Sequence, residues 1–483
     1  MNHAPYFYLG LAISLMSSVL WYSWHLWSKV PFFSIANATP SINADVEWHP
    51  PNATGINNLT TAINGTDVYG FIFNSSMTPG DDYGVYNFCN MPHVRRKEYK
   101  RPDDGFELKY VEVDNTFPIE PYPWSCSDES LFYYGQPQNG NHSAHTYWRG
   151  YQSPSNPFQP SGFQNSSCQF PQITRDGLED SWRHGRDLWE VYHDMLRFLP
   201  GVRQGVEVEV TYRVTGNVIT SQVAGMVVSG MYGTEEDVPL LKQPSTVDSL
   251  EPTYSCPPAS DLFNHIKSTS AWAQHLDLSQ PLFNTLDSVS DVPSSSSSFH
   301  VSWDHYFDNL SARLCHQKPL PCKIGDPSRC VTQDNANAVF RLGEWEYSYI
   351  YRDAPESLSA SAGSFGVWIA ELTQNIRDMV DGKSRVLYRH NIAHDGSLAR
   401  LLSILQVEVM VWPGMGSEVV FEVYSKKENG NWYIRVLWGG KVLRSSSPQL
   451  GVIDMVPLDQ VLAYFDGLVG VRASRVVAFC TSS

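Results

Sequence analysis

The sequence has few charged residues, and basic residues are the scarcer sign. Only 17% of its 483 residues are Asp, Glu, Lys or Arg, against roughly a quarter in an average soluble domain. Its 34 Lys and Arg set against 50 Asp and Glu leave a net charge of −16. A broad basic groove for nucleic acid is therefore disfavoured, and no nucleic-acid partner is expected.

Several other features are absent as well. The 33 Gly and 31 Pro are close to the usual share and show no repeat, which excludes collagen-like and low-complexity chains. An aromatic content of 13% is too high for a disordered chain. There is no C-x-x-C pair, and the His, Asp and Glu residues show no metal-ligand spacing, so no metal or other cofactor is expected.

The eight cysteines instead predict up to four disulfides in an oxidising compartment. Eight cysteines allow 105 pairings, so the connectivity stays open. The candidates are Cys89, Cys126, Cys168, Cys256, Cys315, Cys322, Cys330 and Cys480.

The N-terminus carries an apolar segment. From Ala4 to Trp27 there is no Lys, Arg, Asp or Glu. No Lys or Arg precedes this stretch and Lys29 follows it, so residues 1–27 are either a cleaved signal peptide or a signal anchor. Membrane anchoring through residues 4–27 is expected in the second case.

Asn-x-Ser/Thr sequons cluster in the first third of the chain. Together with the apolar leader they predict a glycoprotein of the secretory pathway, either secreted or held at the cell surface. The eight sequons are at Asn37, Asn52, Asn58, Asn64, Asn74, Asn141, Asn165 and Asn309.

The rest of the chain divides into a lead-in over residues 28–82 and a domain over 83–483. The lead-in is rich in Asn, Thr, Pro and Gly without a sustained period. Alternating apolar residues predict strands in the domain, and spacings of three and four predict helices. The strands are expected at Phe106–Val113, Val206–Val214, Arg385–Tyr388, Val419–Tyr424 and Trp432–Trp438, and the helices at 177–199, 365–379 and 396–406.

This order of elements predicts the α/β class. We expect helices around a mainly parallel central sheet. A polar stretch with short helical pieces, roughly 230–345, predicts an inserted, mostly helical cap.

The most informative short string is Ala393-His394-Asp395-Gly396-Ser397, where a predicted strand gives way to a helix. Ligands bind at such strand ends in α/β sheets. An imidazole there can hydrogen-bond an anionic oxygen, and a carboxyl can protonate a leaving group. Taken alone, the pair is equally explained by Asp395 capping the helix and by His394 as a loop residue.

Six longer stretches are informative together. They read QITRDGLEDSWRHGRDLWEVYHDML, YRVTGNVITSQVAGM, WDHYFDNLSARLCHQKPLPC, VFRLGEWEYSYIYRDAPES, RHNIAHDGSLARLL and WPGMGSEVVFEVY. These stretches resemble the histidine acid phosphatase family, in a secreted fungal-type branch, and they occur in the family's order between about Tyr83 and the C-terminus.

The resemblance implies hydrolysis of phosphate monoesters in two steps. A His attacks phosphorus, a phosphohistidine forms, and water releases phosphate, while arginines clamp the equatorial oxygens. By match to the family, His394 would bind phosphate, Asp395 would protonate the leaving alcohol, and Arg213 would bind phosphate. The alternative for Arg213 is an exposed Arg at the end of a strand.

The sequence departs from the family at one place. The nucleophile motif R-H-x-x-R-x-P should follow the first core strand, but Val113 is followed directly by Asp114-Asn115-Thr116-Phe117-Pro118. Two other strings carry a His near an Arg, around His184 and His93. The first is interpreted as part of an amphipathic helix and the second as a basic surface loop.

Three hypotheses follow from this departure. The chain is an acid phosphatase that uses a displaced His, or it is an inactive protein that binds phosphoesters or a protein partner. Alternatively, the Val113–Asp114 junction reflects an incomplete gene model or a splice variant of an ordinary acid phosphatase.

Overall fold

The computed structural model describes residues 44–66, 88–89, 91, 93–113, 130–135, 143–148, 173–201, 209–233 and 238–482. The chain divides into two compact units, 1–42 and 43–483, and every described residue belongs to the second. The expected signal segment 1–27 lies outside the described residues. Among the described helices, none combines the length and apolar character that crossing a membrane requires.

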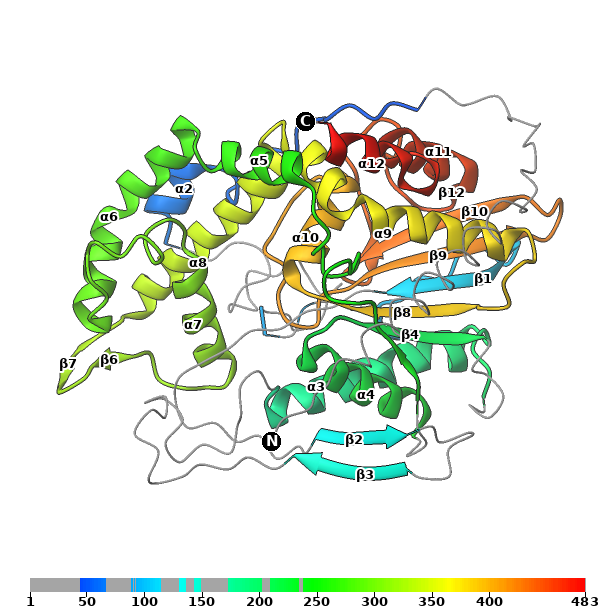
Figure 1. Cartoon of the computed structure of the whole chain (residues 1–483), viewed down its shortest axis with the longest axis horizontal. Helices are drawn as coiled ribbons and strands as arrows, with labels where there is room; N and C mark the ends of the chain where they lie inside the picture. The colour runs from blue at the N-terminus through cyan, green and yellow to red at the C-terminus, as the bar shows by residue number, and fades with distance from the viewer. Residues whose placement is uncertain are drawn as a thin grey trace, which may run out of the picture. The chain divides into compact units, whose positions relative to one another are not determined.

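An eight-stranded mixed sheet forms the centre of the second unit (Figure 1). Its strand order is β11-β10-β9-β1-β8-β4-β5, with β12 paired to β10. Strands β1, β8, β4 and β5 pair in parallel, and β10 runs in the same direction because it is antiparallel to β9, which is antiparallel to β1. The strands are β1 (Phe106–Val113), β4 (Val210–Val214), β5 (Leu240–Leu241), β8 (Tyr388–Ile392), β9 (Val419–Lys426), β10 (Trp432–Trp438), β11 (Lys441–Val442) and β12 (Val456–Pro457).

One strand differs from its predicted position. The expected strand Arg385–Tyr388 is wrong, because the strand begins at Tyr388 and continues to Ile392. Arg389, His390 and Asn391 follow Tyr388 in it, and His390 and Asn391 are buried. These buried polar residues form hydrogen bonds with neighbouring side chains inside the sheet. Because they interrupt the alternation of apolar and polar residues, the strand predicted from that alternation stops at Tyr388.

Helices cover both faces of the sheet (Figure 1). On one face lie α3 (Arg175–Trp189), the π-helical segment η3 (Glu190–Met195) and α4 (Val218–Tyr232). On the other lie α9 (Ser357–Val380), α10 (Asp395–Ile404), α11 (Leu458–Val469) and α12 (Ser474–Thr481). The mainly parallel sheet between helices is therefore confirmed.

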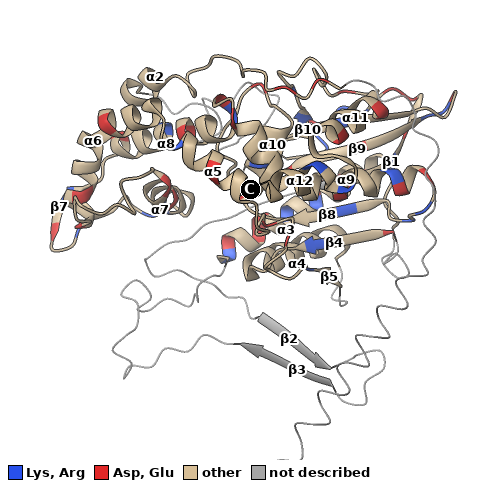
Figure 2. Cartoon of the chain, turned by 45° about the horizontal axis from the view of Figure 1, so that its top comes forward, with Lys and Arg blue, Asp and Glu red and all other residues tan. Residues whose placement is uncertain are grey.

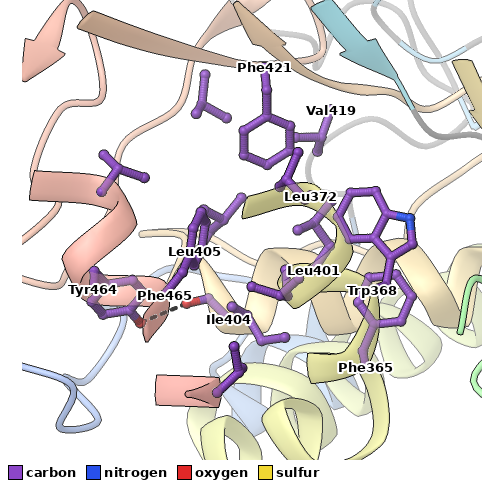
Figure 3. Packing of buried hydrophobic residues seen from close by; sticks show 14 of the residues in the cluster. Phe365, Trp368, Leu372, Leu401, Ile404, Leu405, Val419, Phe421, Tyr464 and Phe465 are labelled. Carbon is purple, nitrogen blue, oxygen red and sulfur yellow. Dashed lines mark hydrogen bonds between the residues drawn. The ribbon is translucent and has the colours of Figure 1, made fainter. Parts of the chain in front are cut away.

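The larger apolar core fills the space between the sheet and α9–α11 (Figure 3). Phe365, Trp368 and Leu372 of α9 pack toward Val419 and Phe421 of β9. The Tyr464 hydroxyl of α11 donates a 2.7 Å hydrogen bond to the backbone oxygen of Ile404, which joins α11 to the end of α10. This core holds α10, and with it His394 and Asp395, firmly against the sheet.

On the opposite face, α3 and α4 cross at two glycines. A Cβ atom on Gly185 would lie 2.1 Å from the backbone oxygen of Val227, and one on Gly230 would lie 2.0 Å from the oxygen of Trp182. Only glycine permits so close an approach of two backbones. Gly185 belongs to the string Arg183-His184-Gly185-Arg186, so helix packing accounts for its glycine.

The predicted cap is present and mostly helical. It contains α5 (Pro257–Ile266), α6 (Ser270–Ser290), α7 (Asp304–Cys315) and α8 (Gln333–Ser348), the hairpin β6 (Cys322–Lys323) and β7 (Asp326–Cys330), and the π-helical segment η4 (Tyr349–Asp353). A separate apolar core built around Phe283, Trp303, Phe307 and Phe340 holds it together. Outside sheet and cap, β2 (Ser130–Gly135) pairs with β3 (Ser143–Trp148).

Part of the predicted lead-in packs onto the folded unit. Helix α2 (Leu59–Asn64) contacts α8, and Arg341 donates a 3.1 Å hydrogen bond from Nε to the backbone oxygen of Ala62. Trp48 donates from Nε1 to the oxygen of Arg352 at 3.0 Å. Residues 44–66 thus make ordered contacts upstream of the expected start at Tyr83, while the boundaries 28–82 and 83–483 themselves stay predictions.

The described cysteines form three disulfides, Cys89–Cys315, Cys256–Cys480 and Cys322–Cys330. Two of them join segments more than 220 residues apart. Cys126 and Cys168 lie outside the described residues. The predicted disulfide chemistry is therefore confirmed for these three pairs.

Candidate active site

The structure places His394 and Asp395 where the carboxyl end of β8 meets the first turn of α10. His394 is the N-cap residue with extended backbone (φ −125°, ψ 160°), and Asp395 begins the helix. An acidic side chain in the first turn faces the unpaired N–H groups and the positive end of the helix dipole. Both residues are partly exposed.

Three donors hold the Asp395 carboxyl group. The Tyr347 hydroxyl of α8 donates to Oδ2 at 2.8 Å, and Nε1 of Trp412 donates to the same oxygen at 2.7 Å. The backbone N–H of Gly396 donates to Oδ1 at 2.7 Å. Burial, and next the charge of Asp395, raise the pKa of Tyr347 well above its usual value, so this hydroxyl keeps the proton that it donates. The carboxyl group is therefore fixed by the cap on one side and by its own helix on the other.

Stacked aromatic rings support these donors. Trp412 stacks on Tyr347 with ring centroids 4.0 Å apart and on Phe307 of α7 at 3.9 Å. Its backbone N–H donates to Oε2 of the buried Glu344 at 2.7 Å. Burial raises the pKa of Glu344 well above its usual value. Trp412 is thereby held by a hydrogen bond at its backbone and by stacking on its ring.

His394 has a hydroxyl and a carboxylate as neighbours. Its Nε2 lies 3.0 Å from Oγ1 of Thr215, which follows β4 and is fully buried. The same nitrogen lies 3.6 Å from Oε1 of Glu251. Its Nδ1 makes no hydrogen bond to the described residues. A tautomer with the proton on Nδ1 accepts from Thr215 and leaves one N–H free to donate.

A second carboxyl group from the cap lies near Asp395. Asp308 follows Phe307 on α7 and is half-buried. Burial raises the pKa of Asp308 to about 8, and the charges of Asp395 and Asp304 act in the same direction. Near neutral pH the Asp308 carboxyl group is therefore largely neutral.

Arg213 occupies a different network. Its guanidinium group donates to Oε2 of Glu371 at 2.6 Å, to Oδ1 of Asp248 at 3.0 Å and to Oγ of Ser249 at 2.9 Å. It lines a cavity of about 330 Å³ together with Arg389 of the neighbouring strand. The basic bands on β4 and β8 lie side by side in Figure 2. The structure thus brings His394 and Asp395 together and joins Arg213 to two carboxylates instead, while its role as a phosphate ligand stays a prediction.

The two strings with a His near an Arg hold buried side chains. His184 lies on α3, as predicted, and its Nε2 is 2.8 Å from Oε2 of the buried Glu418. His93 stacks on it with ring centroids 4.5 Å apart, and its Nε2 is 2.8 Å from Oδ2 of Asp187. The expectation of a basic surface loop holds for the exposed Arg96 but is wrong for His93, which is only 5% exposed.

The partners of Asp395 were not predicted from the sequence. Tyr347 and Trp412 lie inside the quoted stretches VFRLGEWEYSYIYRDAPES and WPGMGSEVVFEVY, and Asp308 lies inside WDHYFDNLSARLCHQKPLPC. Because these stretches also carry the family resemblance, their polar and aromatic residues are the signal in the sequence that points to the site. Residues 114–129, which follow the first core strand, lie outside the described residues.

The predicted glycosylation sites are partly described. Asn52, Asn58 and Asn64 are exposed, and Asn309 lies half-buried on α7. Asn37, Asn74, Asn141 and Asn165 lie outside the described residues. Glycosylation itself stays a prediction.

Two curated proteins are similar in sequence. "Counting factor 60" of Dictyostelium discoideum is 24% identical over 293 residues, which are 57% of this chain and 64% of that protein. "Lysophosphatidic acid phosphatase type 6" of Bos taurus is 23% identical over 298 residues, which are 60% of this chain and 65% of that protein. The match thus spans somewhat less than two thirds of each relative. Over part of its length the chain is thus similar in sequence to a phosphatase.

The chain was also compared with solved structures and with family models. The phytase of Klebsiella sp. ASR1 has 15% identity and a TM-score of 0.48, with 77% of this chain and 97% of that chain covered. The phytase of D. castellii has 11% identity and a TM-score of 0.46, with coverages of 82% and 88%. No family model matches the chain.

Proposed function

We propose that the site at His394 and Asp395 acts on phosphate monoesters. The observation that carries this proposal is the placement of an imidazole with a free ring nitrogen beside a carboxyl group held by Tyr347 and Trp412. One group can bind an anionic oxygen, and the other can deliver a proton to the alcohol that leaves. The sequence similarity to a protein named as a lysophosphatidic acid phosphatase supports the same chemistry.

The hydrogen bonds support the following roles for individual atoms. Oδ2 of Asp395 already accepts from two side chains, so a proton on this carboxyl group is carried by Oδ1, which becomes the donor to the leaving oxygen. In the tautomer with the proton on Nδ1, His394 can donate to a phosphate oxygen from Nδ1 while Nε2 accepts from Thr215. Asp308, when neutral, adds no negative charge that would repel the phosphate.

Hydrolysis through a phosphohistidine also requires a nucleophilic His. His93 is poorly suited, because both of its ring nitrogens have partners, Asp187 and the backbone oxygen of Met91. His184 is buried and bonded to Glu418 through Nε2. A sequence that restores R-H-x-x-R-x-P between Val113 and Asp114, if a transcript carries it, would supply the missing group at the end of β1.

The absence of that motif favours a second candidate function, the binding of a phosphoester without turnover. Losing the nucleophile of a catalytic unit removes nearly all of its rate advantage. Both candidates predict that the site binds phosphate, and only the first predicts hydrolysis. Sequencing transcripts across Val113 and Asp114 separates an incomplete gene model from a true pseudoenzyme.

Phosphate binding can be tested directly by calorimetric titration with inorganic phosphate at acid pH. His394→Ala should weaken binding several-fold, whereas His265→Ala, which removes an exposed imidazole on α5, should not. Arg213→Ala tests the remaining family-matched residue in the same titration. A parent protein that binds no phosphate would contradict both candidate functions.

We further propose that the chain passes through the secretory pathway and is secreted or anchored at the cell surface. Three disulfides support passage through an oxidising compartment. The proposal predicts glycans on exposed sequons such as Asn52 and Asn64. A mass shift on treatment with an N-glycosidase measures them, and an unchanged mass would count against the proposal.

A further inference from the structure

A short run of basic residues stands out on a chain of net charge −16. The seven residues Arg95–Arg101 include five Lys or Arg and one Glu. Arg96, Lys97, Lys100 and Arg101 are exposed. Since the remainder of the chain is more acidic still, this run is a local reversal of the surface charge.

The run is firmly anchored although its cations are exposed. Tyr99 is buried, and its hydroxyl donates to Oε1 of Glu422 at 2.8 Å. The backbone oxygen of Lys100 accepts a 2.7 Å hydrogen bond from Nη1 of Arg435. The Arg435 guanidinium also lies over the Tyr99 ring, 5.1 Å from its centroid. The backbone that presents Lys97, Lys100 and Arg101 is therefore fixed before any ligand arrives, which lowers the entropic cost of binding.

These side chains border a hollow of about 710 Å³. Its lining residues include Lys97, Lys100, Arg101 and Lys441 of β11. The volume falls within the range of small-molecule sites. None of the lining residues belongs to the site around His394 and Asp395.

Two acidic residues of the hollow are paired with arginines, whereas three of its cations make no ion pair with the described residues. Glu98 pairs with Arg95 at 3.2 Å, and Asp454 lies 3.6 Å from Nε of Arg435. Lys97, Lys100 and Arg101 make no ion pair with any described residue. The third acidic lining residue, Asp103, makes no ion pair with the described part of the chain. Positive charge is thus in excess inside the hollow.

We propose that this hollow binds a small polyanion that carries several phosphate groups. Arg101 can bind a phosphate through two N–H donors, and Lys97 and Lys100 supply point charges for neighbouring phosphates. A singly charged carboxylate would match the cluster poorly, because its one negative charge would leave most of the positive charge of the cluster unneutralised. The inference concerns a second site and does not depend on turnover at Asp395.

Calorimetric titration with inorganic tripolyphosphate tests the proposal on the full chain. In low salt we expect binding that weakens as ionic strength rises, because exposed charges are screened. The triple variant Lys97→Ala, Lys100→Ala and Arg101→Ala should bind at least about tenfold more weakly, since each exposed ion pair contributes a few-fold to Kd. Because the three side chains are exposed, its thermal unfolding should match that of the parent.

A matched variant separates the site from the overall charge. Lys267→Ala, Arg329→Ala and Lys383→Ala remove the same charge from exposed positions elsewhere and should leave the affinity unchanged. An equal loss in both triple variants would overturn the proposal, as would a parent that does not bind. If His394→Ala abolishes binding and the first triple variant does not, tripolyphosphate sits in the proposed active site, and the second site is wrong while the proposed function stands.

Discussion

The hydroxyl group of Tyr347 donates a 2.8 Å hydrogen bond to Oδ2 of Asp395. Tyr347 lies at the end of a cap helix and Asp395 begins a helix of the α/β core, so this bond joins the two parts of the unit at the proposed site. Trp412 reaches the same oxygen from a third segment. The orientation of the Asp395 carboxyl group therefore depends on how the cap packs against the core.

Tyr347→Phe should impair proton delivery without removing the carboxyl group. A hydrogen bond to a charged group contributes about 1.5–3 kcal/mol, so we expect kcat for an aryl phosphate to fall about tenfold or more, with a smaller change in KM. Tyr351→Phe is the matched control, because Tyr351 contacts the Tyr347 ring at 5.2 Å and makes no hydrogen bond to Asp395. Equal rates in the two variants would show that the Tyr347 hydroxyl does not position Asp395.

Asp308→Asn should change how stability depends on pH. Burial raises the pKa of Asp308 to about 8, so between about pH 4 and pH 8 the folded state keeps a proton that the unfolded state releases. The contribution of Asp308 to the free energy of unfolding therefore falls as the pH rises through this window. In Asp308→Asn, whose side chain does not titrate, this decrease in stability should be absent.

Thermal unfolding measures this effect. The Tm of Asp308→Asn relative to the parent should increase from pH 4 to pH 8. Asp261→Asn, at an exposed position on α5, serves as the control. A difference in Tm that stays constant across the window would contradict the assignment of a neutral Asp308.

Two glycines of α4 should respond to alanine in opposite ways. In Gly230→Ala the new Cβ would meet the backbone oxygen of Trp182 at 2.0 Å, and forcing the helices apart should cost about 1–3 kcal/mol or more. Gly225→Ala meets nothing within 4 Å and should stabilise the helix by up to about 1 kcal/mol. Urea unfolding of both variants measures the pair, and a stable Gly230→Ala protein would mean that α3 and α4 do not cross so closely.

The disulfides should contribute unequally to stability. Cys256–Cys480 closes a loop between residues 224 apart, and Cys322–Cys330 a loop between residues 8 apart. Chain entropy alone assigns these loops roughly 5 and about 2.5 kcal/mol, with the first reduced by the remaining cross-links. Replacing Cys256 and Cys480 by Ala should therefore lower Tm more than replacing Cys322 and Cys330, and the opposite order would contradict this account.

The sequence predicted those elements whose apolar residues alternate or recur along one face. Phe106–Val113 and Trp432–Trp438 are strands with the expected bounds. The strand Tyr388–Ile392 was misplaced because its buried residues include His390 and Asn391, which bond to other polar groups instead of packing in an apolar core.

The site was only partly predictable for a related reason. His394 and Asp395 are adjacent in sequence and lie at a strand-to-helix junction, so a local string was enough to find them. Tyr347 and Trp412 lie 48 and 17 residues from Asp395, and only the packing of the cap on the core brings them to its carboxyl group. The spacing of apolar residues within either segment does not predict these contacts with Asp395.

The most direct test of the proposed activity is the hydrolysis of an aryl phosphate at acid pH by the purified 483-residue chain. Asp395→Ala serves as the blank, and Asp378→Ala, a residue of α9 outside the site, as the matched control. Turnover in the parent and in the control that disappears in the blank is the result that the account predicts. Turnover that is unchanged in Asp395→Ala would contradict it, and a parent that binds phosphate without turnover would identify the chain as a phosphoester-binding pseudoenzyme.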